Sequence, residues 1–450
     1  MEGLALDVRF DGFADPVGVL ARDGNGAVAF AYRPRYLADP DAVALSLSLP
    51  LTDEPYGDVA ARPFFDNLLQ ERDSALADIM AREGLARDDI AGLLYHLGKD
   101  CAGALSVLPA GAPAVKVPGD YASDYVPIGS ERMARIVNAL HRRQRLPDGT
   151  SDPSPLAGVQ SKIALTVLPD GSFAEPRPGS GAPTTHILKV PDERHLHDAR
   201  DEAEALALSR ALGFDTTDAT VAPFSGIEAL LVTRFDRALT QDGRIVRVHQ
   251  EDFAQALGLP AALKYERRGA PGRRFDAEAI RRVLDATADP AGAKDTFIRA
   301  TLFDLMTGNT DGHAKNFALL HRIGGRILMA PRYDLLPTKL DNSLTDELAY
   351  RIGEAERLDA ITGDDFSIFL SRLGIDSAAA RKRVRERLTT SIAASLARQL
   401  GDLDRRNMKR FADLIAANID TLTTAFGLAT PTEAKQRDAF IGSAGAWLMS

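Results

Sequence analysis

The first part of the chain combines alternating apolar and polar positions with stretches of helical spacing. Residues 4–10 and 45–50 alternate with a period of two, as strands do, and two apolar runs flank the hairpin signal Asp23-Gly-Asn-Gly26. Residues 63–79 and 90–97 repeat with helical spacing instead. We predict an α+β module whose apolar residues pack a core, and no pattern in it points to catalysis.

Two stretches rich in proline and glycine interrupt this pattern, at residues 109–119 and 147–155. After the second stretch, a loop of small residues at 157–162 leads into a strand. A further apolar strand follows at residues 185–190, and it is interrupted by a single lysine, Lys189. We therefore predict a second group of strands that begins beyond the linkers.

Helices dominate the rest of the chain. A buried strand at residues 228–233 precedes a polar connector at 234–237, and from about residue 238 the pattern is mainly helical. The helices predicted beyond the first module are residues 131–142, 198–212, 251–257, 276–287, 295–306, 363–373, 376–400 and 404–426. These elements divide the chain into three predicted parts, residues 1–120, 121–235 and 236–450.

One polar loop lies within apolar surroundings, directly after the helix predicted at residues 295–306. Asp311 and Asn316 are five positions apart in this loop, and a pair of strands with a glycine turn then returns the chain to Asp334. Phosphoryl-transfer enzymes use this spacing: an Asp accepts the proton of the substrate hydroxyl, and an Asn five residues on holds Mg²⁺ with a second Asp. Taken alone, the pattern equally suits a loop capped by a hydrogen-bonded Asp and Asn.

Residues upstream supply further parts of such a site. The small residues at 157–162 let backbone N–H groups approach phosphates, although an ordinary strand lead-in has the same pattern. Lys189 within an apolar strand needs an anionic partner, such as nucleotide phosphate, unless its amine reaches solvent. Glu202 and Glu204 lie on different faces of the next helix, and either could pair with Lys189. The order of these parts is that of the bilobal protein-kinase architecture, so we predict an α+β, protein-kinase-like fold with a mainly helical C-terminal lobe.

Charge and composition restrict the partners. The 450 residues are 45% hydrophobic and 26% charged, as in ordinary globular proteins. With 54 basic against 63 acidic residues, the net charge of −9 disfavours broad nucleic-acid or membrane-surface binding, so we expect DNA contact only through a partner. The single cysteine, Cys101, excludes an internal disulfide and is interpreted as a small core residue. No signal segment or membrane-spanning run is evident, and we expect a cytoplasmic protein.

The chain resembles the HipA family of serine/threonine kinases, the toxin halves of bacterial toxin–antitoxin pairs. The resemblance covers most of the chain and is carried by Ser46-Leu-Ser-Leu-Pro50, Pro63 to Leu69, Leu156 to Lys162, Thr185 to Lys189, Val232 to Arg237, Gln250 to Glu266, Thr310 to Phe317 and Tyr333-Asp334. It implies ATP and Mg²⁺ as cofactors and a protein substrate. Known members phosphorylate aminoacyl-tRNA synthetases, stall translation and are neutralised by a small helix-turn-helix antitoxin of the HipB type, which also represses the operon.

The resemblance also implies roles for residues. Asp311 would be the catalytic base, Asn316 and Asp334 would bind Mg²⁺, and His313 and Lys315 would contact substrate or phosphate. Counting eleven residues back from the helix-ending Gly213, as in the family, selects Glu202 as the partner of Lys189. The residues implied to hold ATP are Ala157, Gly158, Val159, Gln160, Ser161 and Lys162 of the nucleotide loop, Lys189 with Glu202, and Val232, Thr233 and Phe235 beside the adenine.

One position departs from the family. Family members carry a serine just before the nucleotide loop, and its autophosphorylation ejects that loop and silences the enzyme. Pro155 stands at that position here, with Ser154 beside it. Because proline cannot be phosphorylated, we hypothesise that Ser154 is the autophosphorylation site.

Three other functions fit parts of the pattern. A small-molecule or lipid kinase shares the arrangement of Asp, Asn and Asp. A non-catalytic pseudokinase could act as a co-repressor in a DNA-bound complex, although the intact lysine, aspartates and asparagine argue against it. A metal hydrolase built on His313 and His321 lacks the helical i, i+4 spacing of histidines that such sites use.

Overall fold

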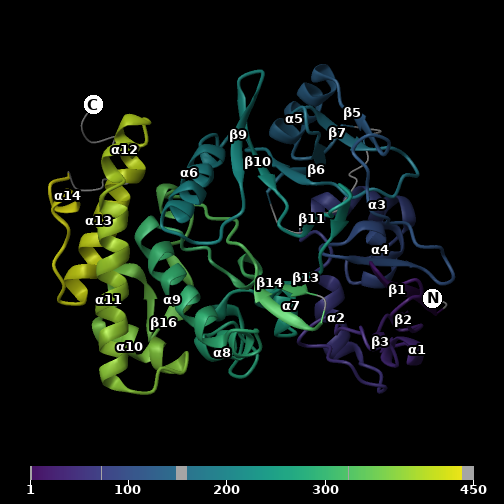
Figure 1. Cartoon of the computed structure of the whole chain (residues 1–450), viewed down its shortest axis with the longest axis horizontal. Coiled ribbons are helices and arrows are strands. Elements are labelled where there is room, and N and C mark those ends of the chain that lie inside the picture. The colour runs from purple at the N-terminus through teal and green to yellow at the C-terminus, as the bar shows by residue number, and fades with distance from the viewer. Residues whose placement is uncertain (1–2, 72, 148–149, 151–159, 323, 438–450) are drawn as a thin grey trace. The chain divides into compact units, whose positions relative to one another are not determined.

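The computed structural model describes residues 3–71, 73–147, 150, 160–322 and 324–437. Contacts between residues group the chain into two units. Unit 1 comprises residues 1–200, 217–261 and 318–330, and unit 2 comprises residues 201–216, 262–317 and 331–450. Each unit contains both helices and strands, so the chain is α+β, as predicted (Figure 1).

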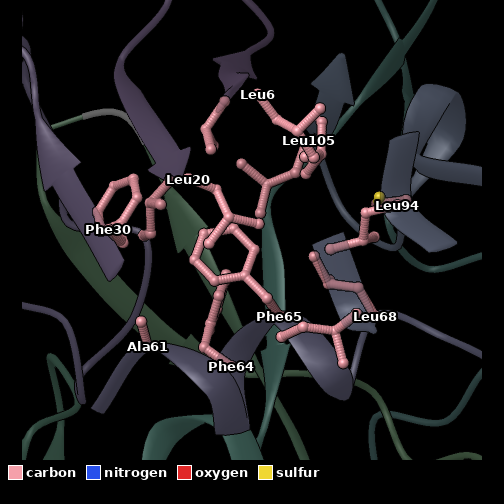
Figure 2. Packing of buried hydrophobic residues seen from close by; sticks show 14 of the residues in the cluster. Leu6, Leu20, Phe30, Ala61, Phe64, Phe65, Leu68, Leu94 and Leu105 are labelled. Atoms are coloured by element: carbon pink, nitrogen blue, oxygen red, sulfur yellow. The ribbon is translucent and has the colours of Figure 1, made fainter. Parts of the chain in front are cut away.

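The N-terminal module of unit 1 is built on a four-stranded antiparallel sheet in the order β3-β2-β1-β4. Its elements are β1 (Leu4–Phe10), β2 (Gly18–Arg22), β3 (Val28–Tyr32), α1 (Pro34–Leu37), α2 (Asp58–Asp66), α3 (Asp73–Glu83), α4 (Ile90–Leu97) and β4 (Leu105–Pro109). The sheet packs against α2 and α4 in one apolar core, whose buried members include Leu6, Leu20, Phe30, Phe64, Phe65, Leu94 and Leu105 (Figure 2). Cys101 belongs to this core, as predicted, and burial raises the pKa of its thiol to about 12.

The second sheet of unit 1 has six strands in the order β5-β7-β6-β8-β10-β9, and all neighbouring pairs are antiparallel. The strands are β5 (Tyr125–Pro127), β6 (Lys162–Val167), β7 (Phe173–Pro176), β8 (His186–Lys189), β9 (Ala219–Phe224) and β10 (Ile227–Thr233). Helix α5 (Ser130–Arg143) packs on this sheet through an apolar cluster that includes Met133, Ile136, Leu140, Ile163 and Leu188. The predicted strands at 185–190 and 228–233 are confirmed as β8 and β10, and the structure shows that they pair with each other.

Two smaller sheets complete unit 1. The first consists of β11 (Arg237–Leu239) and β12 (Ile245–Arg247). The second consists of β13 (Gln250–Asp252), β14 (Ala318–Arg322) and β15 (Arg326–Met329), and the short helix α7 (Phe253–Ala256) follows β13.

Buried charges connect β12 to the N-terminal module. Arg247 Nε donates to Asp11 Oδ2 at 2.7 Å, and Arg247 Nη1 donates to Asp100 Oδ1 at 3.0 Å.

Helix α9 (Pro290–Thr307) lies at the centre of unit 2. Against it pack α8 (Ala277–Asp285), α11 (Ala378–Ala397) and α13 (Lys409–Ala425). Unit 2 also contains most of α6 (Asp198–Ala211), together with β16 (Glu347–Ile352), β17 (Ala355–Arg357), α10 (Gly363–Arg372), α12 (Leu400–Arg405) and α14 (Thr432–Lys435). The helix predicted at 295–306 is confirmed, but it begins earlier because Asp289 caps it by accepting a hydrogen bond from Gly292 N at 3.0 Å.

Two predictions in the N-terminal module are wrong. Residues 45–50 form a turn closed by a bridge between Ser46 and Leu49, not a strand. The turn is held by a distant residue that the sequence pattern does not reveal. Leu47 N donates a hydrogen bond to the buried Glu251 Oε1 at 3.0 Å. The stretch 63–79 is broken between α2 and α3.

The prediction that the chain is mainly helical from about residue 238 overlooked strands. β12 to β17 all lie in this region, and the predicted helix at 251–257 shortens to α7 because its first two residues belong to β13. The helix predicted at 404–426 is divided between α12 and α13, and Asn407 between them has a positive φ of 62°. Within the described ranges, no helix is long and apolar enough to cross a membrane.

Candidate active site

The polar loop that follows α9 is anchored where it leaves the helix. α9 ends at Gly308, whose φ of 78° is left-handed and suits glycine. Asn309 Oδ1 then accepts a hydrogen bond from Asp311 N at 3.1 Å, and Thr310 N donates to Thr338 Oγ1 at 2.9 Å. The buried helix therefore gives the start of the loop a defined direction, and Asp311 lies close to that start.

The carboxylate of Asp311 is partly buried and accepts a short hydrogen bond. Tyr265 Oη donates to Asp311 Oδ1 at 2.6 Å. Burial, reinforced by the negative charge of Asp311, raises the pKa of Tyr265 above its usual range. Tyr265 therefore stays protonated and acts as a donor toward one oxygen of the carboxylate.

Asn316 closes the loop onto Asp311. Its Nδ2 donates to the backbone oxygen of Asp311 at 2.9 Å, and His313 N donates to the same oxygen at 2.7 Å. The capped loop considered from the sequence is therefore present. Because the amide nitrogen is used in the cap, the orientation of the Asn316 side chain is fixed and its amide oxygen remains as the end that can ligate a cation.

The chain that follows β15 returns to this loop, as the pair of strands predicted. Tyr333 Oη donates to the backbone oxygen of Lys315 at 2.7 Å, so the residue after it, Asp334, comes beside the loop. Asp334 has a φ of 58°, a left-handed conformation that is uncommon outside glycine. Such backbone conformations cluster at functional sites, where the surrounding structure imposes them.

Arg332 connects the segment around Asp334 to helix α9. Its Nη2 pairs with Asp304 Oδ1 of α9 at 2.5 Å, and burial raises the pKa of Asp304 in spite of this neighbouring charge. The guanidinium lies over the rings of Phe214 and Phe303, 4.9 and 4.7 Å from their centroids. The end of the α6 segment, α9 and the Asp334 segment are thereby held together within unit 2.

His313 and Lys315 are mostly buried, each 7% exposed. The ring of His313 lies edge-on to that of Tyr265, with centroids 5.2 Å apart and an interplanar angle of 80°. Both residues therefore belong to the packed body of the loop, and their predicted contact with substrate or phosphate stays a prediction.

The two glutamates of α6 differ in their environments. Glu204 Oε1 forms an ion pair with Arg406 Nη1 at 2.8 Å, so this carboxylate already has a cationic partner within unit 2. Glu202, in contrast, is only 2% exposed. Which of the two glutamates pairs with Lys189 stays a prediction.

Unit 1 contains the lysines expected to hold nucleotide. The pairing of β6 with β8 sets Lys162 directly opposite Lys189, so both side chains are on the same face of the sheet. Lys189 is 8% exposed, and Val190 N donates to the backbone oxygen of Ser161 at 2.8 Å, which fixes the loop end against β8. Gln160 precedes this point, whereas Ser154, Ala157, Gly158 and Val159 lie outside the described residues.

The segment expected beside the adenine has much of its backbone engaged. Thr233 N donates to Asp218 O at 2.8 Å, and Arg234 N donates to Thr185 O at 3.0 Å. Val232 is buried in β10, and Phe235 follows the end of that strand, partly exposed. The segment is rigidly held, and its role toward adenine stays a prediction.

The oxygen donors near the loop suit Mg²⁺ better than a softer metal. Across the residues that the structure describes, no cluster of three or more His, Cys, Asp or Glu could hold a metal ion. Mg²⁺ needs only one or two carboxylates with substrate phosphates and water, so an Asn and an Asp are an adequate set.

Sequence reasoning missed Tyr265 and Arg332 as parts of this site. Tyr265 lies in the segment from Gln250 to Glu266 that carried the resemblance, but that segment had no chemical role assigned to it. Arg332 directly precedes Tyr333-Asp334, and this adjacency was the only feature of the sequence that pointed to a part in the site.

A solved structure shares the fold of this chain. The solved complex of HipA, HipB and operator DNA from Shewanella oneidensis MR-1 contains a chain that matches this fold with a TM-score of 0.73 at 24% identity, over 94% of this chain and 98% of that chain. The chain thus has a protein-kinase-like α+β fold, as predicted.

The chain belongs to the HipA family of kinases. The HipA-like C-terminal domain matches residues 154–419, and the HipA N-terminal domain matches residues 6–108. Y4mE, a candidate kinase of Sinorhizobium fredii NGR234, is 36% identical over 416 residues, covering 91% of this chain and 96% of Y4mE. The serine/threonine-protein kinase toxin HipA of Shewanella oneidensis is 29% identical over 332 residues, covering 69% of this chain and 71% of that protein. The division of the chain into three parts, with boundaries near residues 120 and 235, stays a prediction.

Proposed function

We propose that this kinase transfers the terminal phosphoryl group of ATP to a serine or threonine of a protein, with Asp311 as the base that accepts the hydroxyl proton. The proposal rests on one observation: neighbouring residues hold the carboxylate of Asp311 in a fixed position. One of its oxygens is engaged by Tyr265 and its backbone is fixed by Asn316, while the side chain remains partly exposed. A base must be fixed within hydrogen-bond reach of its proton, and this loop provides such a base.

The remaining roles follow the chemistry of phosphoryl transfer. We assign Asn316 and Asp334 to Mg²⁺, which when bound neutralises charge on the phosphates. Lys162 and Lys189 with residues 157–161 would hold the phosphates, Glu202 would pair with Lys189, and residues 232–235 would bind the adenine. His313 and Lys315 would contact substrate or phosphate. The facing lysines of β6 and β8 favour an anionic ligand on that side of the sheet.

The biological role rests on the family. We propose that the chain is the toxin of a toxin–antitoxin pair and that its target is an aminoacyl-tRNA synthetase, so that phosphorylation inhibits translation. The name of the relative from Shewanella oneidensis, a serine/threonine-protein kinase toxin, supports the first part. A helix-turn-helix antitoxin would neutralise it and carry the contact with DNA, since the solved relative is a complex with HipB and operator DNA.

Replacement of the base tests the proposed function. Asp311→Asn removes the proton acceptor and keeps the size of the side chain, so phosphoryl transfer is expected to fall by about a hundredfold or more while nucleotide binding persists. The measurement is phosphoproteomics of cells that express either form, which also identifies the target. Asp359→Asn, an exposed carboxylate of the same unit, is the matched control and keeps the wild-type phosphorylation. Full transfer by Asp311→Asn would refute the assignment of the base.

A further inference from the structure

The segment Lys264-Tyr265-Glu266 lies against the candidate catalytic loop, and beyond the hydrogen bond of Tyr265 to Asp311 the proposed function gives it no role. Ala314 N of the loop donates to the backbone oxygen of Lys264 at 3.1 Å. Tyr265 Oη reaches Asp311 Oδ1 at 2.6 Å, and Glu266 Oε2 accepts a hydrogen bond from Arg351 N of β16 at 2.7 Å. Three consecutive residues thus connect the loop to the neighbouring strand, and the middle one contacts the base itself.

The ring of Tyr265 is held on several sides. His313 contacts it edge-on, and the guanidinium of Arg267 lies 4.3 Å from its centroid. The guanidinium of Arg268 lies 5.2 Å from the same centroid. Lys264 and Glu266 on either side are only 8% and 6% exposed, so the backbone of the segment cannot shift easily. The hydroxyl group of Tyr265 is therefore presented to Asp311 in one fixed position.

We propose that Tyr265 is a positioning residue for the catalytic base: its hydroxyl group occupies Oδ1 of Asp311 and so leaves Oδ2 as the oxygen that receives the substrate proton. The inference rests on the proposed function. In the transfer step the substrate oxygen forms a bond to the γ-phosphorus, and the bond to the bridging oxygen breaks with its electron pair going to ADP. The hydroxyl proton passes to Oδ2 of Asp311. A donor fixed on Oδ1 restricts rotation of the carboxylate and keeps Oδ2 in the orientation required for reaction.

The environment of Tyr265 suits a donor and not a second base. Burial and the nearby negative charge raise its pKa, so the hydroxyl proton is retained at physiological pH. The tyrosine therefore contributes orientation without competing for the substrate proton.

Tyr265→Phe removes the hydroxyl group alone and tests the inference. The ring and its contacts with His313 and Arg267 survive, so the variant is expected to fold and to bind ATP with an unchanged KM. The value of kcat is expected to fall by about tenfold to a hundredfold, as for the loss of a hydrogen bond to a charged group. The assay measures turnover of radiolabelled ATP by the full chain, with kcat expressed per site that binds a fluorescent ATP analogue, so that unfolded protein is not counted.

Tyr350→Phe is the matched control. Tyr350 is a buried tyrosine of the same unit whose hydroxyl group is 2.8 Å from Thr301 Oγ1 and does not touch Asp311, so kcat should remain at the wild-type value. If Asp311→Asn is inactive while Tyr265→Phe keeps the wild-type kcat, or changes KM alone, the inference on Tyr265 is wrong and the proposed function stands. If Asp311→Asn itself remains active, the proposed function fails and the inference fails with it.

Discussion

Lys162 and Lys189 occupy facing positions on β6 and β8, and this arrangement predicts how the sheet responds to ATP. Two lysines on one face of a sheet offer several charged N–H donors to the oxygens of a phosphate. We expect Lys189→Met to lower the affinity for ATP by at least about tenfold, as for removal of one partner of a buried charge pair. Thermal unfolding should then show little or no ATP-dependent increase in Tm, because ligand binding stabilises only in proportion to its affinity.

A control variant separates this effect from a general loss of charge. Lys99→Met removes an exposed lysine of the same unit and should keep the ATP-dependent increase in Tm. An unchanged affinity in Lys189→Met would exclude this lysine from the nucleotide site.

The sequence revealed site residues only where their spacing is local. Asp311 and Asn316 belong to one loop, so five positions of sequence sufficed to group them. The hydrogen bond of Tyr265 to Asp311 spans 46 positions, and that of Arg332 to Asp304 spans 28. The pairing of Glu204 with Arg406 likewise spans 202 positions. No local pattern contains such information.

At the level of elements, the junction between α9 and the candidate catalytic loop depends on Gly308. A Cβ atom there would lie 2.8 Å from Leu414 Cδ2 and 3.2 Å from Lys339 Cβ, and the positive φ is unfavourable for any other L-residue. We expect Gly308→Ala to destabilise the protein by about 2–5 kcal/mol, from backbone strain of about 1–2 kcal/mol together with overpacking of about 1–3 kcal/mol. The measurement is thermal unfolding, combined with kcat of the folded fraction, which should also fall because the loop shifts.

Gly427 offers a matched control for backbone strain. It follows α13 with a φ of 65°, but an added Cβ would meet no atom within 4 Å. Gly427→Ala should therefore cost only the strain, about 1–2 kcal/mol, and leave kcat unchanged. Equal Tm values for the two variants would show that the contact between an added Cβ at position 308 and α13 does not lower the stability of the protein.

Elements with a strong periodic pattern were predicted well, and those stabilised by distant partners were not. The apolar repeat over 295–306 identified α9, and the glycine turn identified β14 with β15. Residues 45–50 also alternate, but Ser46 and Leu47 use their polar groups to bind Glu251, more than 200 positions away. A period of two therefore predicted a strand where side-chain contacts produce a turn.

At the scale of the whole molecule, the composition of residues 234–237 did not reveal how this segment is attached. The residues 234–237 looked like a polar connector, yet Arg234 and Asp236 are buried and pair at 2.9 Å. Arg237 Nη1 lies 3.0 Å from the same carboxylate, and burial with neighbouring cations lowers the pKa of Arg237 to about 10. Gly103 N of the N-terminal module also donates to Asp236 at 3.0 Å. Burial of such charges is costly unless they are paired, so this segment is a fixed part of unit 1.

The net charge of the whole molecule predicts how it meets DNA. Non-specific affinity for DNA comes from phosphates that basic residues neutralise, and a chain with a net charge of −9 provides little of this energy. We expect the kinase alone to show no binding to its own promoter duplex below about micromolar concentration at physiological salt, the range of non-specific complexes. Its helix-turn-helix partner should bind alone, and addition of the kinase should increase the size of that complex. Fluorescence anisotropy with a labelled duplex measures all three mixtures.

Two outcomes would contradict this prediction. Nanomolar binding by the kinase alone would require a concentrated basic surface and would contradict a purely indirect contact. A partner–DNA complex that the kinase leaves unaltered would contradict the proposed pairing.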